Sequence, residues 1–141
     1  MFQPAFQPQV PLPVVLVVDD NPAIRDMVSW ALELDGYEPA EAADGQEALD
    51  WMYNAAREGR YPAVILLDLA MPGMDGTTFL ARLKEYRELH AATFPRPTVV
   101  LITANPGADS ASMGVEQVII KPFHVRDLLD TVRLFLLPTS F

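Results

Sequence analysis

The chain has 141 residues, a length typical of one domain with its own hydrophobic core. It contains no cysteine, which excludes disulfide frameworks, thiolate nucleophiles and cysteine-ligated metal sites. Its formal net charge of −9 argues against direct binding to nucleic acid or to an anionic membrane surface.

The N-terminal region does not resemble a secretory signal. No basic residue precedes Arg25, and four prolines interrupt the only apolar candidate stretch. No apolar run approaches the roughly 20 residues that span a bilayer. We therefore expect a cytoplasmic protein.

Residues 1–12 are expected to form a flexible, proline-rich tail. They contain two copies of a Phe-Gln-Pro triplet, and their prolines are incompatible with a helix or a central strand. The alternative is a docking peptide with Phe2 and Phe6 as anchors. The predicted domain spans residues 13–138, and residues 139–141 form a short C-terminal end.

From Val14 onward, apolar strands alternate with amphipathic helices. Wholly apolar or β-branched runs predict strands buried on both faces, at Val14–Val18, Val64–Leu67, Thr98–Ile102 and Val118–Ile120. Residues Tyr37–Glu41 are predicted to form a short strand. The predicted helices start at Asn21-Pro22, at Asp44 with Glu47 in a capping box, and at Asp75, and a last helix spans Val125–Phe135.

The inner face of the first helix is predicted from its spacing to include Ile24, Met27, Val28 and Ala31, with Gly36 as its stop. If the fifth strand begins at Val115, only residues 104–114 remain for the fourth helix and its connections. That helix is therefore expected to have about one or two turns.

This alternation predicts an α/β fold, a doubly wound five-stranded parallel sheet of order 2-1-3-4-5 with a shortened fourth helix. Functional groups of such sheets gather beyond the carboxyl ends of the strands. The residues that directly follow the apolar runs are Asp19, Asp20, Asp68, Thr103 and Lys121. We therefore expect three carboxylates, a hydroxyl and an ammonium group at one edge.

Three carboxylates in one crevice repel each other, and a divalent cation relieves that repulsion. A site with oxygen ligands alone suits Mg²⁺ or Mn²⁺. A carboxylate is also a known nucleophile for phosphoryl transfer, a reaction that needs mainly positioning and neutralisation of charge. Singly, each residue has an ordinary structural explanation as a cap, turn, strand or surface residue. Their common position at strand ends favours the functional interpretation.

Four segments resemble the receiver domain of bacterial two-component response regulators: Val15–Asn21, Leu67–Gly76, Thr103-Ala104 and Lys121–Phe123. The resemblance covers about residues 13 to 137 and implies the flavodoxin-like strand order given above. It identifies Asp68 as the acceptor of a phosphoryl group from a histidine kinase or a histidine phosphotransfer protein.

The resemblance also implies individual roles. Asp20, Asp68 and the backbone carbonyl of Ala70 would bind the metal directly, and Asp19 partly through water. Thr103 and Lys121 would contact the phosphoryl oxygens. A cis Lys121-Pro122 bond is expected, although about 5–6% of such bonds are cis in folded proteins.

The same resemblance predicts a stand-alone receiver that signals through an unknown downstream protein. It would be a phospho-acceptor that assists its own phosphorylation and dephosphorylation, and not an enzyme with turnover. A homodimer is a possible assembly. One alternative is a receiver-like binding module that no longer depends on phosphate. Another is an aspartyl-nucleophile phosphohydrolase, which Ala70 disfavours because these enzymes typically need a second acid at that position.

Two features of the sequence concern regulation. The position three residues before Lys121, often aromatic in receivers, is Val118, which has no ring to swing. The short span of residues 104–114, its turn-like start and its poor helix formers Ser110, Ser112 and Gly114 lead us to expect a mobile segment that becomes ordered on phosphorylation. The alternative is that packing against the sheet already orders a short helix. Ala70 and Asn105 are expected, by resemblance, to flank the path of the hydrolytic water.

Overall fold

Five strands and five helices alternate along the chain in the computed structural model, which describes residues 12–69, 76–89 and 96–136. Their bounds are β1 Val14–Val18, α1 Pro22–Leu34, β2 Glu38–Ala42, α2 Gly45–Arg57, β3 Val64–Asp68, α3 Gly76–Leu89, β4 Thr98–Thr103, α4 Ser110–Met113, β5 Gln117–Ile120 and α5 Val125–Leu136. Several predictions lie outside the described residues. They concern residues 1–11 of the predicted tail, Ala70, the Asp75 cap and the C-terminal end.

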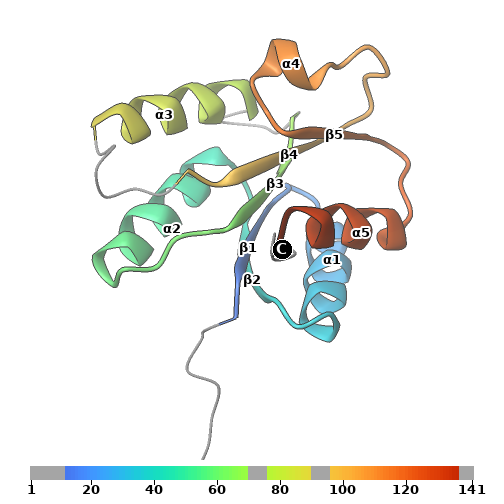
Figure 1. The fold of residues 1–141 in the computed structure, drawn as a ribbon, viewed down its shortest axis with the longest axis horizontal. Coiled ribbons are helices and arrows are strands. Elements are labelled where there is room, and N and C mark those ends of the chain that lie inside the picture. Colours follow the sequence, from blue (N-terminus) through green and yellow to red (C-terminus); the bar gives the residue numbers. More distant parts are fainter. Residues whose placement is uncertain (1–11, 70–75, 90–95, 137–141) are drawn as a thin grey trace, which may run out of the picture.

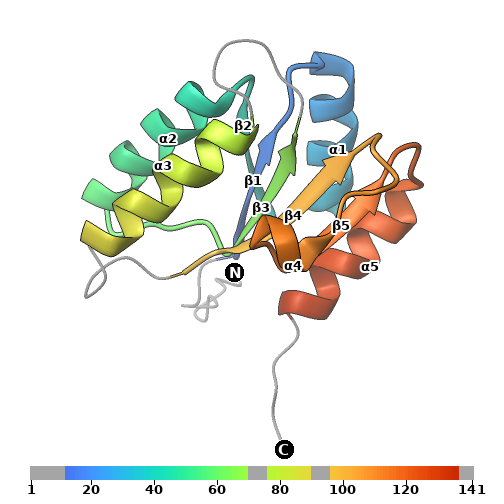
Figure 2. The same ribbon diagram turned by 90° about the horizontal axis from the view of Figure 1, so that it is seen from above.

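The strands form one parallel sheet in the order β2-β1-β3-β4-β5, which confirms the predicted fold class. Helices α1 and α5 cover one face, and α2, α3 and α4 lie on the other (Figures 1 and 2). Every residue of β1 and β3 is buried. This burial explains their uninterrupted apolar sequences, because a central parallel strand contacts helices on both faces.

Two separate apolar clusters make up the core, one on each face of the sheet. The α2 and α3 side includes Met52, Phe79 and Leu101. The α1 and α5 side includes Leu32 and Leu128. Alternate residues of each strand contribute to opposite clusters, so the strands are fixed between two packed layers and their carboxyl ends are held at one edge.

Side-chain caps begin the first two helices where the sequence predicts them. Asn21 accepts hydrogen bonds from the amides of Ala23 and Ile24 at the start of α1. Asp44 accepts from the Glu47 amide at 2.9 Å. The Glu47 carboxylate accepts in turn from the Ala43 amide, one residue earlier than a standard capping box.

The predicted inner face of α1 was wrong at Met27, whose exposed fraction is 42%. The buried residues of this helix are Val28, Ser29, Ala31 and Leu32. A helix that packs on one sheet buries only a stripe of its surface. Leu32 lies within this stripe, whereas Met27 lies at its margin. Met27 instead belongs to an exposed apolar row beside the buried stripe.

The fourth helix is a single turn, as the limited length between β4 and β5 predicts. Asp109 caps Ser110–Met113, accepting from the Ser112 amide at 3.2 Å. Gly114 ends the turn with a φ of 69°, a left-handed conformation that glycine adopts readily. Within the described ranges, the helices are all too short or too polar to cross a bilayer.

A bidentate ion pair joins the ends of α1 and α5. Arg133 donates from Nε to Asp35 Oδ2 at 2.9 Å and from Nη2 to Asp35 Oδ1 at 2.7 Å. These hydrogen bonds hold the pKa of the Asp35 carboxyl below its ordinary value. A folded-state pKa below the unfolded one stabilises the protein above the unfolded pKa, and this contribution is lost as the pH falls through the folded pKa.

Replacing Asp35 with asparagine is therefore expected to lower the free energy of unfolding at about pH 7 and to have much less effect near about pH 3. Because the pair is exposed, the loss should be small and should shrink in high salt. Urea unfolding of wild type and Asp35→Asn at both pH values measures it. Equal deficits at the two pH values would contradict this explanation.

Candidate functional site

One edge of the sheet collects the polar residues that follow the strands. Asp19 follows β1, Asp68 ends β3, Thr103 ends β4 and Lys121 follows β5. The parallel register aligns these ends, with Asp68 beside Ile102 in the sheet. The structure thus places these predicted site residues at one edge.

Three carboxylates form the centre of this site. One oxygen each from Asp19, Asp20 and Asp68 lies within 4.8 Å of the other two. Asp19 and Asp68 are buried, with exposed fractions of 3% and 5%, whereas Asp20 is exposed. Asp19 is oriented by the Asn21 amide, which donates to its Oδ1 at 2.8 Å.

This donor set fits a magnesium ion. Two oxygens on one Mg²⁺ lie about 3–4 Å apart, because each Mg–O distance is about 2.1 Å. The carboxylate oxygens lie within 4.8 Å of one another, close to that value, so small side-chain rotations would let them hold an ion whose remaining ligands would be waters and other oxygens. Magnesium usually keeps several waters and uses one or two carboxylates, which suits a site open at Asp20.

Lys121 and Thr103 approach Asp68 from the neighbouring strands. The Lys121 ammonium lies 3.5 Å from Asp68 Oδ2, and its side chain is 27% exposed. Thr103 is buried, and its Oγ1 accepts a hydrogen bond from the Asn105 amide at 3.1 Å. Its hydroxyl hydrogen can still be donated to an anion. The Lys121-Pro122 peptide bond is cis, which confirms that expectation.

Asn105 makes a tight turn directly after Thr103. Its Oδ1 accepts from the Gly107 amide at 2.9 Å, so this oxygen is already engaged within the turn. The second lone pair of this oxygen and the side-chain NH₂ group could still contact a water. Ala70, the other residue predicted beside the hydrolytic water, lies outside the described residues.

Arg25 contacts the site and was not singled out from the sequence. Its Nη1 donates to the backbone carbonyl of Asp19 at 2.7 Å, and its Nε pairs with Glu41 at 3.3 Å. The guanidinium thereby ties the end of β2 to the loop that presents the carboxylates. An arginine on the first turns of a helix looks like a solvated residue, so only the tertiary contact reveals it.

Gly76 was also missed as a determinant of the site's geometry. Its amide donates to the Leu69 carbonyl at 3.0 Å, which joins the start of α3 to the end of β3. A Cβ at Gly76 would lie 2.8 Å from Leu69 Cα and 3.0 Å from the carbonyl oxygen of Asp68. The close approach of these two backbones therefore requires glycine at this position.

Comparison with known proteins gives a consistent result. The family "Response regulator receiver domain" matches residues 15–133. Over 136 residues the chain is 36% identical to the DNA-binding dual master transcriptional regulator RpaA of Synechocystis, covering 92% of this chain and 51% of that protein. It is 33% identical over 130 residues to the transcriptional regulatory protein SrrA of Staphylococcus aureus, covering 89% and 48%. The chain spans about half the length of these curated relatives.

Solved structures show the same fold. The chemotaxis protein CheY4 of Vibrio cholerae is 31% identical with a TM-score of 0.70, over 89% of this chain and 99% of that one. The response regulator TrrA of Thermotoga maritima, in complex with Mg²⁺-BeF, is 26% identical with a TM-score of 0.71, over 89% and 100%.

Proposed function

The chain belongs to the response regulator receiver domain family, and we propose that it accepts a phosphoryl group on Asp68 with the help of a bound Mg²⁺. The observation that supports this most directly is the grouping of Asp19, Asp20 and Asp68 beside the Lys121 ammonium. A nucleophilic carboxylate, a set of hard oxygen ligands and a fixed cation are what phosphoryl transfer to an aspartate needs. In this proposal Asp19 and Asp20, with the Ala70 carbonyl, complete the metal site.

The side chains have distinct tasks in the transfer. An Asp68 carboxylate oxygen forms a bond to phosphorus as the bond from phosphorus to the donor breaks, and the donor leaves with the electron pair. Lys121 is positioned to neutralise charge on the phosphoryl oxygens, and the Thr103 hydroxyl to donate a hydrogen bond to one of them. The metal, when bound, supplies further positive charge. Burial of Asp68 strengthens these interactions by excluding water.

The proposed donor is a histidine kinase or a histidine phosphotransfer protein. The exposed side of α1, which begins beside Asp20, presents an apolar row of Ala23, Met27, Trp30 and Leu34. Trp30 and Leu34 are 64% and 70% exposed. An exposed apolar row next to a reaction site supports docking of another protein there.

Incubation with acetyl phosphate tests the proposed function. With Mg²⁺ the protein should gain one phosphoryl group, and mass spectrometry after borohydride trapping should place it on Asp68. With EDTA in place of the metal, the gain should fall sharply. Labelling of another residue, or labelling that is unaffected by EDTA, would overturn the proposal.

The lifetime of the aspartyl phosphate is expected to depend on Ala70. Alanine has no side-chain group that can hydrogen-bond a hydrolytic water, so of Ala70 and Asn105 only the asparagine could orient it. Ala70→Asn should therefore shorten the half-life several-fold, whereas Ala70→Val, which adds bulk without an amide, should not. The decay of phosphorylated protein after removal of the donor measures both. An unchanged or longer half-life in Ala70→Asn would remove this residue from the explanation.

Residues 104–114 are expected to become more protected on phosphorylation. The described hydrogen bonds of α4 form only one turn, closed by the Met113 amide on the Asp109 carbonyl and the Val115 amide on the Ser110 carbonyl. One isolated turn is easily opened. Amide hydrogen exchange with and without beryllofluoride and Mg²⁺ measures the change. Strong protection in the free protein that beryllofluoride leaves unchanged would contradict it.

A further inference from the structure

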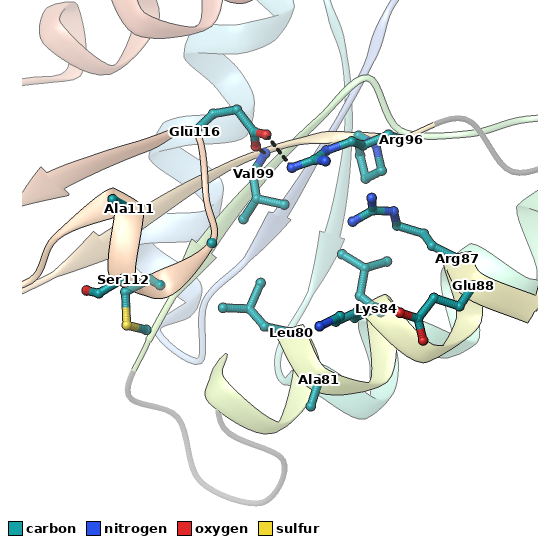
Figure 3. A pocket seen from close by; sticks show the side chains of 14 residues that line it. Leu80, Ala81, Lys84, Arg87, Glu88, Arg96, Val99, Ala111, Ser112 and Glu116 are labelled. Carbon is teal, nitrogen blue, oxygen red and sulfur yellow. Dashed lines mark hydrogen bonds and ion pairs between the residues drawn. The ribbon is translucent and has the colours of Figure 1, made fainter. Parts of the chain in front are cut away.

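A groove of about 920 Å³ separates α3 from β4 and the single turn of α4. Leu83 and Val99 are buried at its floor, and Leu80 and Met113 line one end while still half-buried. Figure 3 shows the groove with α3 along one side and the strand bearing Val99 along the other. It lies away from the carboxylate site, whose residues do not line it.

The single turn of α4 forms one wall of this groove, through Ala111, Ser112 and Met113. In a doubly wound sheet each crossover helix covers the strands it connects. Here one turn links β4 to β5, and the side chains of β5 that face α4 are incompletely covered. Val118 is half-buried and Ile120 is 37% exposed. The sheet therefore lacks the helical cover at this position that its other strands have.

The lining of the groove changes from apolar to basic along α3. Leu80, Lys84 and Arg87 follow one another at helical spacing, and Arg96 faces them from the start of β4 (Figure 3). Arg96 pairs with Glu116 at 3.1 Å, but neither Lys84 nor Arg87 makes an ion pair with another described residue. These three cations are among only ten in a chain of net charge −9. Glu88 and Glu116 also line the groove, so its charged lining has three cations against two carboxylates, a local excess of positive charge on an acidic protein.

Strand addition cannot explain binding at this place. Strand β4 is hydrogen-bonded to β3 on one side and to β5 on the other, so its backbone is fully used by the sheet. A ligand in the groove must therefore be held by side chains. An amphipathic helix inserts an apolar face into such a groove without offering its own backbone.

We propose that this groove binds an acidic amphipathic helix of a partner protein, with apolar side chains at the Leu80 and Met113 end and carboxylates toward Lys84 and Arg87. The partner helix occupies the space that a longer fourth helix would fill. Its acidic side is complementary to the basic end, whereas the rest of this acidic protein repels it. The binding does not require phosphorylation of Asp68.

A labelled synthetic helix tests the proposal with unphosphorylated protein, so a failure of the proposed phosphoryl transfer does not affect the outcome. The probe has about 15 residues, with leucines at helical spacing and glutamates along one adjoining side. A second probe has lysines in place of the glutamates. Fluorescence anisotropy should show saturable binding of the acidic probe only, and amide chemical-shift changes should map to α3, α4 and the start of β4.

Charge reversal identifies the groove as the binding site. The double variant Lys84→Glu/Arg87→Glu should weaken binding of the acidic probe by about tenfold or more. The control Arg57→Glu/Arg126→Glu makes the same change in net charge at exposed positions on α2 and α5 and should not. Leu80→Ser, checked for an unchanged fold by circular dichroism, should also weaken it.

Three results would overturn the proposal. These are no binding of the acidic probe, equal weakening by both double variants, or shift changes outside the groove. If the acidic probe does not bind but a small organic anion such as a nucleotide binds in the groove, the first of these results would identify a small-molecule site instead.

Discussion

Asp68→Asn protein is expected to gain no phosphoryl group from acetyl phosphate under conditions that label wild type fully. Asparagine keeps the size of the side chain, but its neutral amide oxygen is not a nucleophile for phosphorus. Asp68 is buried and lies 3.5 Å from Lys121, so no other carboxylate described has the same position relative to that cation. Intact-protein mass spectrometry should detect no added phosphoryl group in this variant.

Two further variants distinguish loss of the nucleophile from loss of a metal-site carboxylate and from loss of a carboxylate elsewhere. Asp20→Asn removes a proposed metal ligand, and should slow labelling by at least about tenfold and raise the Mg²⁺ concentration required, because even indirect metal partners contribute about 10–100-fold. Asp50→Asn makes the same chemical change on α2, away from the site, and should label like wild type. Labelling of Asp68→Asn to the wild-type extent would show that the acceptor is another residue.

The sequence predicts the positions of the strands and the edge at which the site lies because both depend on local patterns. A short run of valines and a leucine such as Val14–Val18 favours a strand covered on both faces, because it is β-branched and shorter than a typical helix. Since parallel strands end at one edge, Asp68 and Lys121 can be placed near each other from their positions alone. The cap at Asn21 and the short α4 follow from equally local chemistry.

Features that depend on the packing between elements could not be predicted in this way. Helical spacing does not show how wide the buried stripe of α1 is, which is why Met27 was misplaced. The reach of Arg25 to the Asp19 carbonyl depends on where β2 ends. The groove beside Lys84 and Arg87 lies between α3 and α4, and a sequence pattern does not show how far apart two helices pack.

Gly76→Ala is expected to impair phosphorylation more than its effect on stability explains. The new Cβ would lie 2.8 Å from Leu69 Cα, and the neighbouring contacts are also backbone atoms, which cannot rotate away. Either α3 or the segment from Asp68 to Leu69 must move. A displacement near the reacting oxygen can cost about 100-fold in rate, while overpacking costs about 1–3 kcal/mol of unfolding free energy.

Gly59→Ala is the matched control for this variant. Gly59 has a φ of 73° with no atom near its Cβ position, so alanine there costs about 1–2 kcal/mol of backbone strain without touching the site. Both variants should therefore be less stable than wild type in urea. At a temperature where both are folded, only Gly76→Ala should be slow to label with acetyl phosphate, by roughly 10-fold to 100-fold. Equal labelling rates in the two variants would show that Gly76 serves stability alone, because the displaced backbone would then leave the geometry of Asp68 intact.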